Sequence, residues 1–301
     1  MPSRAQGGHP RPPEPSPADS HASPNGSFGS CLLVSGRLYP DGIVSPKLTP
    51  RRPAGDRLPS SRRPLENRLL AALPADAQGR LLPELEVVHL ADGDVLYESG
   101  DELRYVYFPT DSIVSLACAT ADGESMEISA VGNEGMVGVS ALLGGQTAPN
   151  RAVVRSPGSA YRLGRRAFQE EFNRHGAMLR LMLCYTQSLI TQMGLIVACN
   201  RHHHVEQQVC RWILASLDRL PGSRMTVTQE MIGGMLGVRR EGVTAAIGDL
   251  QRRGVIDHHR GWITVLDRPG LEKLSCECYA VVKAETERLL PYLDLHHHEV
   301  A

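Results

Sequence analysis

The spacing of hydrophobic and polar positions changes twice along the chain. Between Leu85 and Leu163, short runs rich in Val, Ile, Tyr and Phe alternate with turn dipeptides such as Asp92-Gly93 and Gly144-Gly145. Short strands at regular intervals, separated by such turns, are typical of an antiparallel barrel or double-sheet roll. The pattern therefore predicts a jelly-roll-like β-roll, preceded by a short amphipathic helix at residues 65–75.

A long helical pattern follows over residues 177–199, which contain no proline. Six positions keep the three-four spacing of a coiled-coil seam: Leu179, Met182, Thr186, Leu189, Met193 and Ile196. A neighbouring stripe recurs every seven residues: Leu183, Ile190 and Val197. Two stripes fit a helix that buries one face on its own domain and another on a partner, so we predict a dimerisation helix with the six-residue seam. A buried core helix is the alternative.

The same segment is long enough to cross a bilayer. However, the polar side chains of Tyr185–Ser188, Thr191 and Gln192 lie near its centre, where a bilayer would penalise them. We therefore expect no membrane contact.

Residues 226–266 carry the strongest functional pattern. Thr228 stands where an N-cap would, before an apolar turn that ends at Gly237, a residue suited to a left-handed helix end. A second helix follows with a predicted inward face of Val243, Ala246, Ile247 and Leu250. Gly254 ends it, and two short strands then enclose the turn at 258–261. This order predicts a winged helix-turn-helix.

The second helix would place its N-terminal end nearest the bases of duplex DNA. Arginine there binds guanine edges, and a glutamate accepts from cytosine. Arginines at the far end and in the wing would meet phosphates, which supply affinity but no sequence information. The predicted DNA-binding residues are Thr228, Gln229, Arg239, Arg240, Glu241, Thr244, Arg252, Arg253 and Arg260.

Composition changes this picture little outside the N-terminal region. The net charge of -1 excludes a uniformly basic coat, and 5% aromatic residues argue against stacking on single strands. Thirteen of the 21 prolines lie in residues 1–64, so we predict a disordered, mildly basic extension over 1–63. Seven scattered cysteines and the lack of an apolar run in residues 1–30 indicate a reducing, cytoplasmic location.

Two histidine runs and a C-x-C pair are the candidate metal ligands. Adjacent histidines at 202–204 and 296–298 diverge on a helix, and Cys276 and Cys278 would diverge in the same way, without further ligands nearby. We therefore predict no metal site and no catalytic residues, since no phosphate loop or hydrolase motif occurs. A redox thiol at the C-x-C pair and a metal-dependent enzyme built on the histidine runs remain alternatives.

The order of parts resembles the Crp/Fnr family of bacterial transcription regulators. The resemblance covers about residues 65–285 and is closest in three segments: VEQQVCRWIL (205–214), TQEMIGGMLGVRREGVT (228–244) and GVIDHHRGWITVLDRPGLE (254–272). It implies an α+β fold, a homodimer that reads a near-palindromic operator in double-stranded DNA, and RNA polymerase as a partner. The family commonly has a second basic residue where Ala245 stands, so the preferred operator should differ from that of its best-known member.

The resemblance also implies an effector pocket, which departs from the cyclic AMP pattern. The family's ribose-binding Glu corresponds to Val139, and its Arg-Ser pair falls near Ala148-Pro149. Cyclic AMP binding is therefore expected to be weak or absent, and the effector stays unidentified. The pocket residues implied are Gly135, Gly138, Val139, Ala148, Arg151 and Thr186. Only Cys31 lies where oxygen-sensing members hold an iron–sulfur cluster, so no cluster is expected.

The predicted organisation is an extension at 1–63, a β-roll sensor at 64–172, a dimerisation helix at 173–201, a winged domain at 202–290 and a tail at 291–301. The alternative to a DNA-binding regulator is a small-molecule binding module whose winged domain contacts protein.

Overall fold

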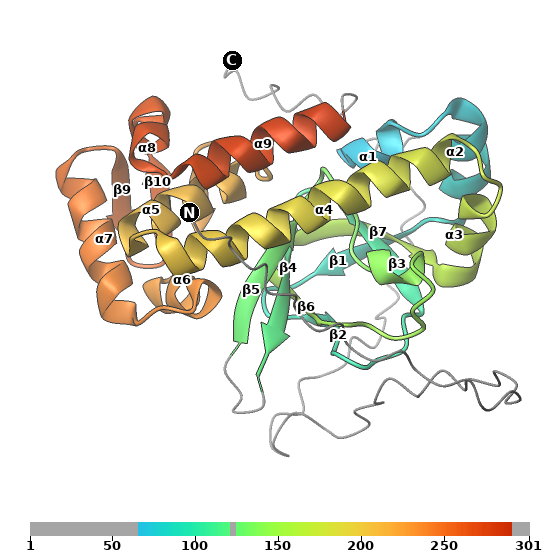
Figure 1. Ribbon diagram of the computed structural model, residues 1–301, viewed down its shortest axis with the longest axis horizontal. Helices are drawn as coiled ribbons and strands as arrows, with labels where there is room; N and C mark the ends of the chain where they lie inside the picture. The colour runs from blue at the N-terminus through green and yellow to red at the C-terminus, as the bar shows by residue number, and fades with distance from the viewer. Residues whose placement is uncertain (1–65, 121–124, 291–301) are drawn as a thin grey trace, which may run out of the picture. The chain divides into compact units, whose positions relative to one another are not determined.

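The computed structural model describes residues 66–120 and 125–290 (Figure 1). The predicted extension at 1–63 and tail at 291–301 lie outside the described residues, and the domain boundaries proposed from the sequence stay predictions. Within the described part, antiparallel sheets come first and helices follow, with a helix-turn-helix near the C-terminal end. The predicted α+β fold class is confirmed.

Two antiparallel sheets form the β-roll. Three strands pair in the order β1-β7-β3, and four pair in the order β2-β6-β4-β5. Their bounds are β1 Glu86–Leu90, β2 Val95–Tyr97, β3 Tyr105–Pro109, β4 Ile113–Ala119, β5 Ser125–Val131, β6 Arg151–Ser156 and β7 Gly158–Gly164. Apolar side chains of both sheets enclose one core, in which Val106, Phe108 and Leu163 are almost fully buried.

Short helices close the roll at its start and end. They are α1 (Arg68–Ala71), α2 (Ala75–Leu81), the 3₁₀ turns η2 (Leu82–Glu84) and η3 (Val139–Ala141), and α3 (Arg165–Phe172). The single helix predicted at 65–75 is wrong, because α1 ends before Pro74 and α2 begins after it. Proline lacks the amide hydrogen that would continue α1 and disfavours helical backbone at the residue before it.

Asn67 joins α1 to two loops of the roll. Its side-chain amide is fully buried and donates to the carbonyls of Pro109 (2.8 Å) and Gly135 (2.9 Å). The side-chain oxygen of Asn67 accepts from the backbone N–H of Leu70 at 3.0 Å and so caps α1. One side chain therefore satisfies three backbone groups that burial would otherwise leave unpaired.

The long helix α4 (Ala177–His202) has one face inside the molecule and one outside. Met182, Thr186, Leu189 and Ile196 are buried within their own chain, where the first three pack on or beside the roll core. The prediction that the six-residue seam contacts a partner is therefore wrong for these positions. Leu179 and Met193, the seam's other members, are half-buried.

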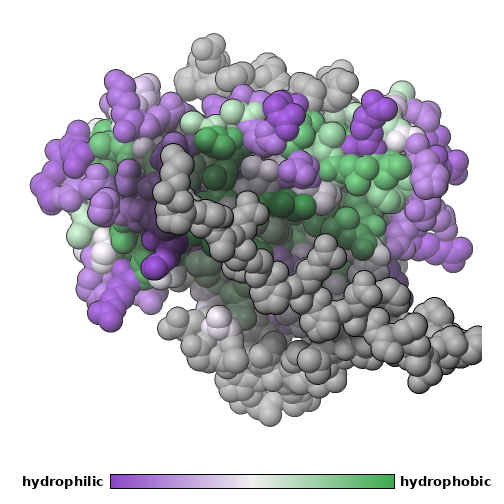
Figure 2. Space-filling view, in the orientation of Figure 1, coloured by the Kyte–Doolittle hydropathy of each residue, from purple (hydrophilic) through white to green (hydrophobic). Residues whose placement is uncertain are grey.

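The neighbouring stripe of α4 is exposed instead. Leu183, Ile190 and Val197 keep 52%, 58% and 51% of their surface accessible. In Figure 2, hydrophobic side chains gather along α4 on the face toward the viewer. By length and apolar composition, α4 is the one helix among the described residues that meets the criteria for a membrane span, as buried core helices also do.

The C-terminal part is helical around a three-stranded sheet of order β8-β10-β9. Its elements are α5 (Val205–Leu217), β8 (Arg224–Thr226), α6 (Gln229–Leu236), α7 (Arg240–Arg252), β9 (Ile256–His259), β10 (Trp262–Val265), α8 (Arg268–Leu274) and α9 (Glu277–Leu289). A second apolar core holds them together, and α9 runs beside α4 (Figure 1).

Replacing Asn67 with Ala should lower the free energy of unfolding by about 2–4 kcal/mol, because two buried carbonyls lose their donor and α1 loses its cap. Chemical denaturation of the full chain measures the change. Asn173→Ala is the control, since Asn173 is exposed and should leave the unfolding midpoint unchanged. Equal midpoints for the two variants would contradict the role of Asn67.

Candidate nucleic-acid interface

The helix-turn-helix is built by capping at both ends of α6. The Thr228 hydroxyl accepts from the backbone N–H of Met231 at 3.2 Å and begins the helix. Gly237 ends it with a φ of +65°, in the left-handed region that glycine adopts without steric cost. The chain then turns through Val238 and Arg239 into α7.

The inward face of α7 fixes which side chains point outward. Four residues of the predicted inward face are buried, as expected: Val243, Ala246, Ile247 and Leu250. On the opposite side, Arg239, Arg240, Glu241 and Thr244 are exposed at the N-terminal end, and Ala245 is exposed beside them. The structure therefore gathers the predicted base-reading residues on one free helix face.

These exposed side chains are only loosely held. The Arg240 guanidinium lies 3.8 Å from the Glu230 carboxylate, with both side chains largely exposed, so the pair adds little energy and leaves the arginine free to reorient. The Thr244 hydroxyl donates to the Gln229 side-chain oxygen at 2.7 Å, which joins the leading ends of α6 and α7. Gln229 is thereby positioned beside the exposed face.

The far end of α7 and the wing carry the remaining arginines. Arg252 forms an ion pair with Asp249, and Arg253 lies 3.4 Å from Glu206 of α5. Arg260 is exposed in the turn between β9 and β10. The predicted wing is confirmed, and Arg224, which sequence reasoning missed, stacks over the Trp262 ring at 3.9 Å beside it. That stacking needs strand β8 next to β10, a pairing no local pattern indicates.

Buried charges connect the winged part to the roll. The guanidinium of Arg219, which follows the C-cap of α5, donates to the Glu134 carboxylate at 2.7 Å. Arg155 of β6 lies 3.6 Å from Glu127 and stacks over the Trp212 ring at 4.5 Å. Sequence reasoning missed this network, because each member belongs to a different element.

Burial and opposing charge compete in this network. Burial lowers the pKa of Arg155, although Glu127 acts in the opposite direction. Burial acts most strongly to lower the pKa of Arg219, but the carboxylates of Glu134, Asp218 and Glu127 together outweigh burial and raise that pKa. Each guanidinium therefore needs its carboxylate to remain a stable buried charge.

The predicted effector residues have structural roles in the roll and in α4. A side chain at Gly135 would overlap the Tyr185 ring, whose hydroxyl donates to the Met136 carbonyl at 2.8 Å. The Thr186 hydroxyl donates to the backbone carbonyl of Met182 at 2.8 Å. The Arg151 guanidinium lies 3.3 Å from the Glu98 carboxylate.

The remaining pocket candidates also belong to the roll. Gly138 precedes η3 with a φ of +99°, Val139 lies in η3, and Ala148 is buried. None of the six predicted residues lines either of two cavities found between α4, α5 and α9. The effector pocket therefore stays a prediction.

Four potential metal ligands converge where α4 ends and α9 begins, and we call them the thiol cluster: Cys199, His203, Cys276 and Cys278. The prediction that the C-x-C pair lacks further ligands is wrong. Cys276 is not helical but caps α9 in an extended conformation, so the two thiols do not diverge. The C-x₃-H spacing at 199–203 places both residues on one helix face and was the signal available in the sequence.

Comparisons with known proteins agree with this architecture. Residues 87–175 match the sequence profile of the cyclic nucleotide-binding domain, and residues 207–274 match that of the Crp-like helix-turn-helix domain. No curated protein matches the chain.

Solved structures show the same fold at low sequence identity. FixK2 from Bradyrhizobium japonicum superposes with a TM-score of 0.55 and 16% identity, covering 64% of this chain and 98% of FixK2. The regulator CLP from Xanthomonas campestris superposes with a TM-score of 0.53 and 15% identity, covering 64% of this chain and 99% of CLP. TTHB099 from Thermus thermophilus, a CRP-family regulator, superposes with a TM-score of 0.52 and 21% identity, covering 62% of this chain and 96% of TTHB099.

A β-roll of the cyclic nucleotide-binding type followed by a winged helix-turn-helix defines a class of regulators rather than enzymes. The chain therefore has the two-domain architecture of Crp/Fnr-type transcription regulators.

Replacing Glu134 with Gln should lower the free energy of unfolding by about 3 kcal/mol, because the buried charge of Arg219 loses its hydrogen-bonded counter-charge. Glu170→Gln removes the partner of the exposed Arg166 and serves as a matched control with no expected change. Thermal and chemical unfolding of both variants measure the difference. A Glu134→Gln protein as stable as wild type would show that the ion pair contributes nothing.

Proposed function

We propose that this chain is a homodimeric, sequence-specific regulator that binds double-stranded DNA. Two copies of α7 would enter successive major grooves of a near-palindromic operator, about one helical turn apart. The observation that carries the proposal is the free face of α7, where Arg239, Arg240 and Glu241 project from a helix whose opposite side is fully buried.

The residues divide by the contacts they are placed to make. Arg239, Arg240 and Glu241 at the leading end would read base edges, helped by Gln229 and Thr244. Arg252, Arg253 and Arg260 would contact phosphates, as would Thr228 at the start of α6. The small exposed side chain of Ala245 allows close approach to the groove floor and removes one family base contact, so operator preference should follow Arg240.

We further propose that dimerisation uses the exposed stripe of α4, which is Leu183, Ile190 and Val197. A soluble monomer rarely leaves a continuous row of large apolar side chains half exposed along one helix. The seven-residue spacing suits pairing of two helices in a shallow left-handed supercoil. This assignment replaces the six-residue seam that the sequence predicted as the dimer contact, because four of its residues are buried in their own chain.

The sensor half would respond to an effector other than cyclic AMP. The positions implied for ribose and phosphate recognition hold Val139 and Ala148, and the nearby Arg151 is engaged with Glu98. An anionic phosphate needs a free positive partner in a confined site. CLP from Xanthomonas campestris is described as responsive to c-di-GMP, so this fold serves effectors besides cyclic AMP. A cytoplasmic location and RNA polymerase as a partner belong to the same proposal.

Base reading by Arg240 can be separated from phosphate contact by Arg253. After selection of a preferred duplex from a random library, Arg240→Ala should cost about 1–3 kcal/mol at one base position and relax preference there. Arg253→Ala should weaken binding to all duplexes alike. It should also lower, by about 1, the slope of the logarithm of the binding constant against the logarithm of the salt concentration. Fluorescence anisotropy over a salt series measures both.

Arg166→Ala is the control for that series, because Arg166 is exposed on α3 and should leave DNA binding unchanged. No sequence preference at low salt would overturn the proposal. A salt slope near zero would favour a winged domain that contacts protein instead.

Placing a charge in the exposed stripe of α4 should abolish the dimer. Ile190→Glu would bring two carboxylates together in an apolar interface, so sedimentation velocity should show a monomer at micromolar concentration. Leu143→Glu, a matched change at an apolar residue 59% exposed on the roll, should remain dimeric. A dimeric Ile190→Glu protein would show that the stripe is not the interface.

A further inference from the structure

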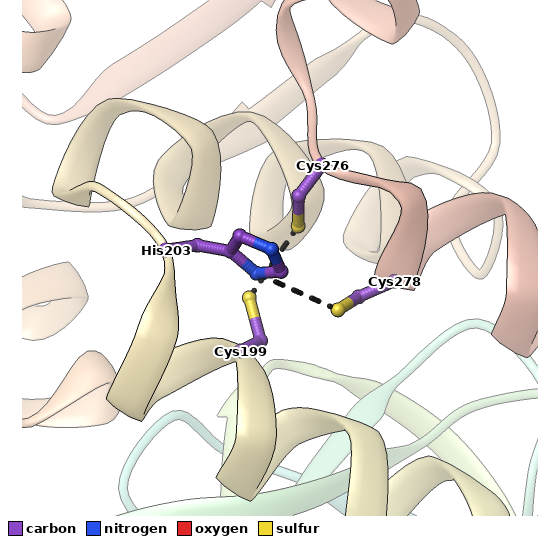
Figure 3. A group of neighbouring side chains, drawn as sticks. All are labelled: Cys199, His203, Cys276 and Cys278. Carbon is purple, nitrogen blue, oxygen red and sulfur yellow. Dashed lines mark hydrogen bonds between the residues drawn. The ribbon is translucent and has the colours of Figure 1, made fainter.

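The thiol cluster joins two helices that belong to different parts of the chain. Cys199 lies in the last turn of α4 and His203 caps that helix, whereas Cys276 caps α9 and Cys278 lies in its first turn. Figure 3 shows the three sulfur atoms and the imidazole ring pointing toward one another.

Its dimensions suit one small ion. The Cys199 and Cys276 Sγ atoms are 3.5 Å apart, and the Cys278 Sγ lies 3.7 Å from the Nδ1 of His203. All four ligand atoms lie within 4.8 Å of one another. A tetrahedral zinc ion with bonds of about 2.3 Å to sulfur and about 2.0 Å to nitrogen would place its ligands roughly 3.5–3.8 Å apart, so small inward shifts complete the site.

The surroundings are those of a closed structural site. The three cysteines are at most 3% exposed, and no solvent-facing ligand position is needed because the protein supplies all four. The Cys199 and Cys276 sulfurs are well beyond the disulfide bond length of about 2.05 Å. A disulfide between them would not account for the position of Cys278 and His203, whose ligand atoms converge on the same point.

A second layer of groups orients and balances the ligands. Glu277 places its carboxylate 3.2 Å from the His203 Nε2, so the ring directs Nδ1 toward the sulfurs. Carboxylate–histidine pairs of this kind commonly hold metal-binding imidazoles in place. Arg211, only 6% exposed, lines the same cavity as Cys278, and its Nε and Nη2 have no hydrogen-bond partner among the described residues.

Charge accounts for that unpaired arginine. Three thiolates with one Zn²⁺ and a neutral imidazole leave the site with one negative charge, and Arg211 supplies the compensating positive charge. The thiol protons pass to the buffer as the metal binds. A soft donor set of three sulfurs and one nitrogen in tetrahedral arrangement favours zinc over magnesium or calcium.

We propose that the joint between α4 and α9 holds one zinc ion, bound by four side chains: Cys199, His203, Cys276 and Cys278. The ion would fix the end of the dimerisation helix to the helix that follows the winged domain. It would do so directly beside His204, where the chain passes from α4 into α5. The metal thereby limits rotation of the DNA-binding part about that junction.

Metal content of the full-length protein tests the proposal without reference to DNA. Purified under reducing conditions, it should contain one zinc per chain by elemental analysis. After removal of zinc by a chelator, titration with Co²⁺ should give the intense visible bands of a tetrahedral ion and a thiolate-to-cobalt charge-transfer band, saturating at one equivalent.

Variants separate the cluster from other candidate ligands. Cys276→Ser and His203→Ala should lose the zinc equivalent, whereas the matched changes Cys118→Ser and His202→Ala at exposed positions should retain it. Replacing the three histidines at 296–298 with Ala should also retain it. Cys278→His should still bind Co²⁺, with weaker charge transfer because one thiolate is lost, which keeps the test independent of variants that fail to fold.

Hydrogen exchange then reports on the mechanical role. Removing zinc should speed amide exchange at the end of α4 and the start of α9 by at least tenfold, with the β-roll strands unchanged. Wild-type protein that binds no zinc or cobalt under reducing conditions would overturn the proposal. A Cys199–Cys276 disulfide found in metal-free protein, or unchanged metal binding in Cys276→Ser, would do so as well.

Discussion

The architecture depends on the two faces of α4. One face packs Met182 and Leu189 into the roll core, which fixes how the helix lies on the roll. That burial leaves the stripe of Leu183, Ile190 and Val197 in solvent, and only association with another apolar surface would cover it. A helix held by its own domain on one side can present the other side in a defined orientation, which is what a symmetric pair of DNA-binding heads requires.

Contacts between the roll and the winged part run through buried charge rather than through apolar packing alone. Arg219, which follows α5, pairs with Glu134 of a roll loop, and Arg155, paired with Glu127 inside the roll, stacks over Trp212 of α5. Such pairs are costly to separate one member at a time, yet add little net stability over apolar packing. They therefore specify one arrangement of the winged part on the roll. An effector that displaced Glu134 would change the balance between this arrangement and others.

The sequence was most informative where short-range rules apply. Thr228, Gly237 and Gly254 mark helix ends through local backbone preferences, so the helix-turn-helix and its exposed arginines could be predicted from spacing. The same is true of the strand-and-turn alternation of the roll. Periodicity also identified both stripes of α4, but it could not tell which stripe faces the chain's own core, because that depends on where the roll packs.

Features built from distant segments could not be predicted. Cys199 and Cys276 are adjacent only because α9 returns along α4, and the Arg219–Glu134 pair depends on how α5 meets the roll. Pro74 is a different case: its effect on the predicted helix at 65–75 was local and could have been recognised from the residue itself.

Hydroxyl-radical footprinting of the full-length protein on its selected duplex tests the central claim most directly. The account predicts two protected half-sites related by a two-fold axis, with centres about 10 base pairs apart and protection on one side of the duplex. A single protected half-site at saturating protein, or protection spread evenly over any sequence, would contradict it.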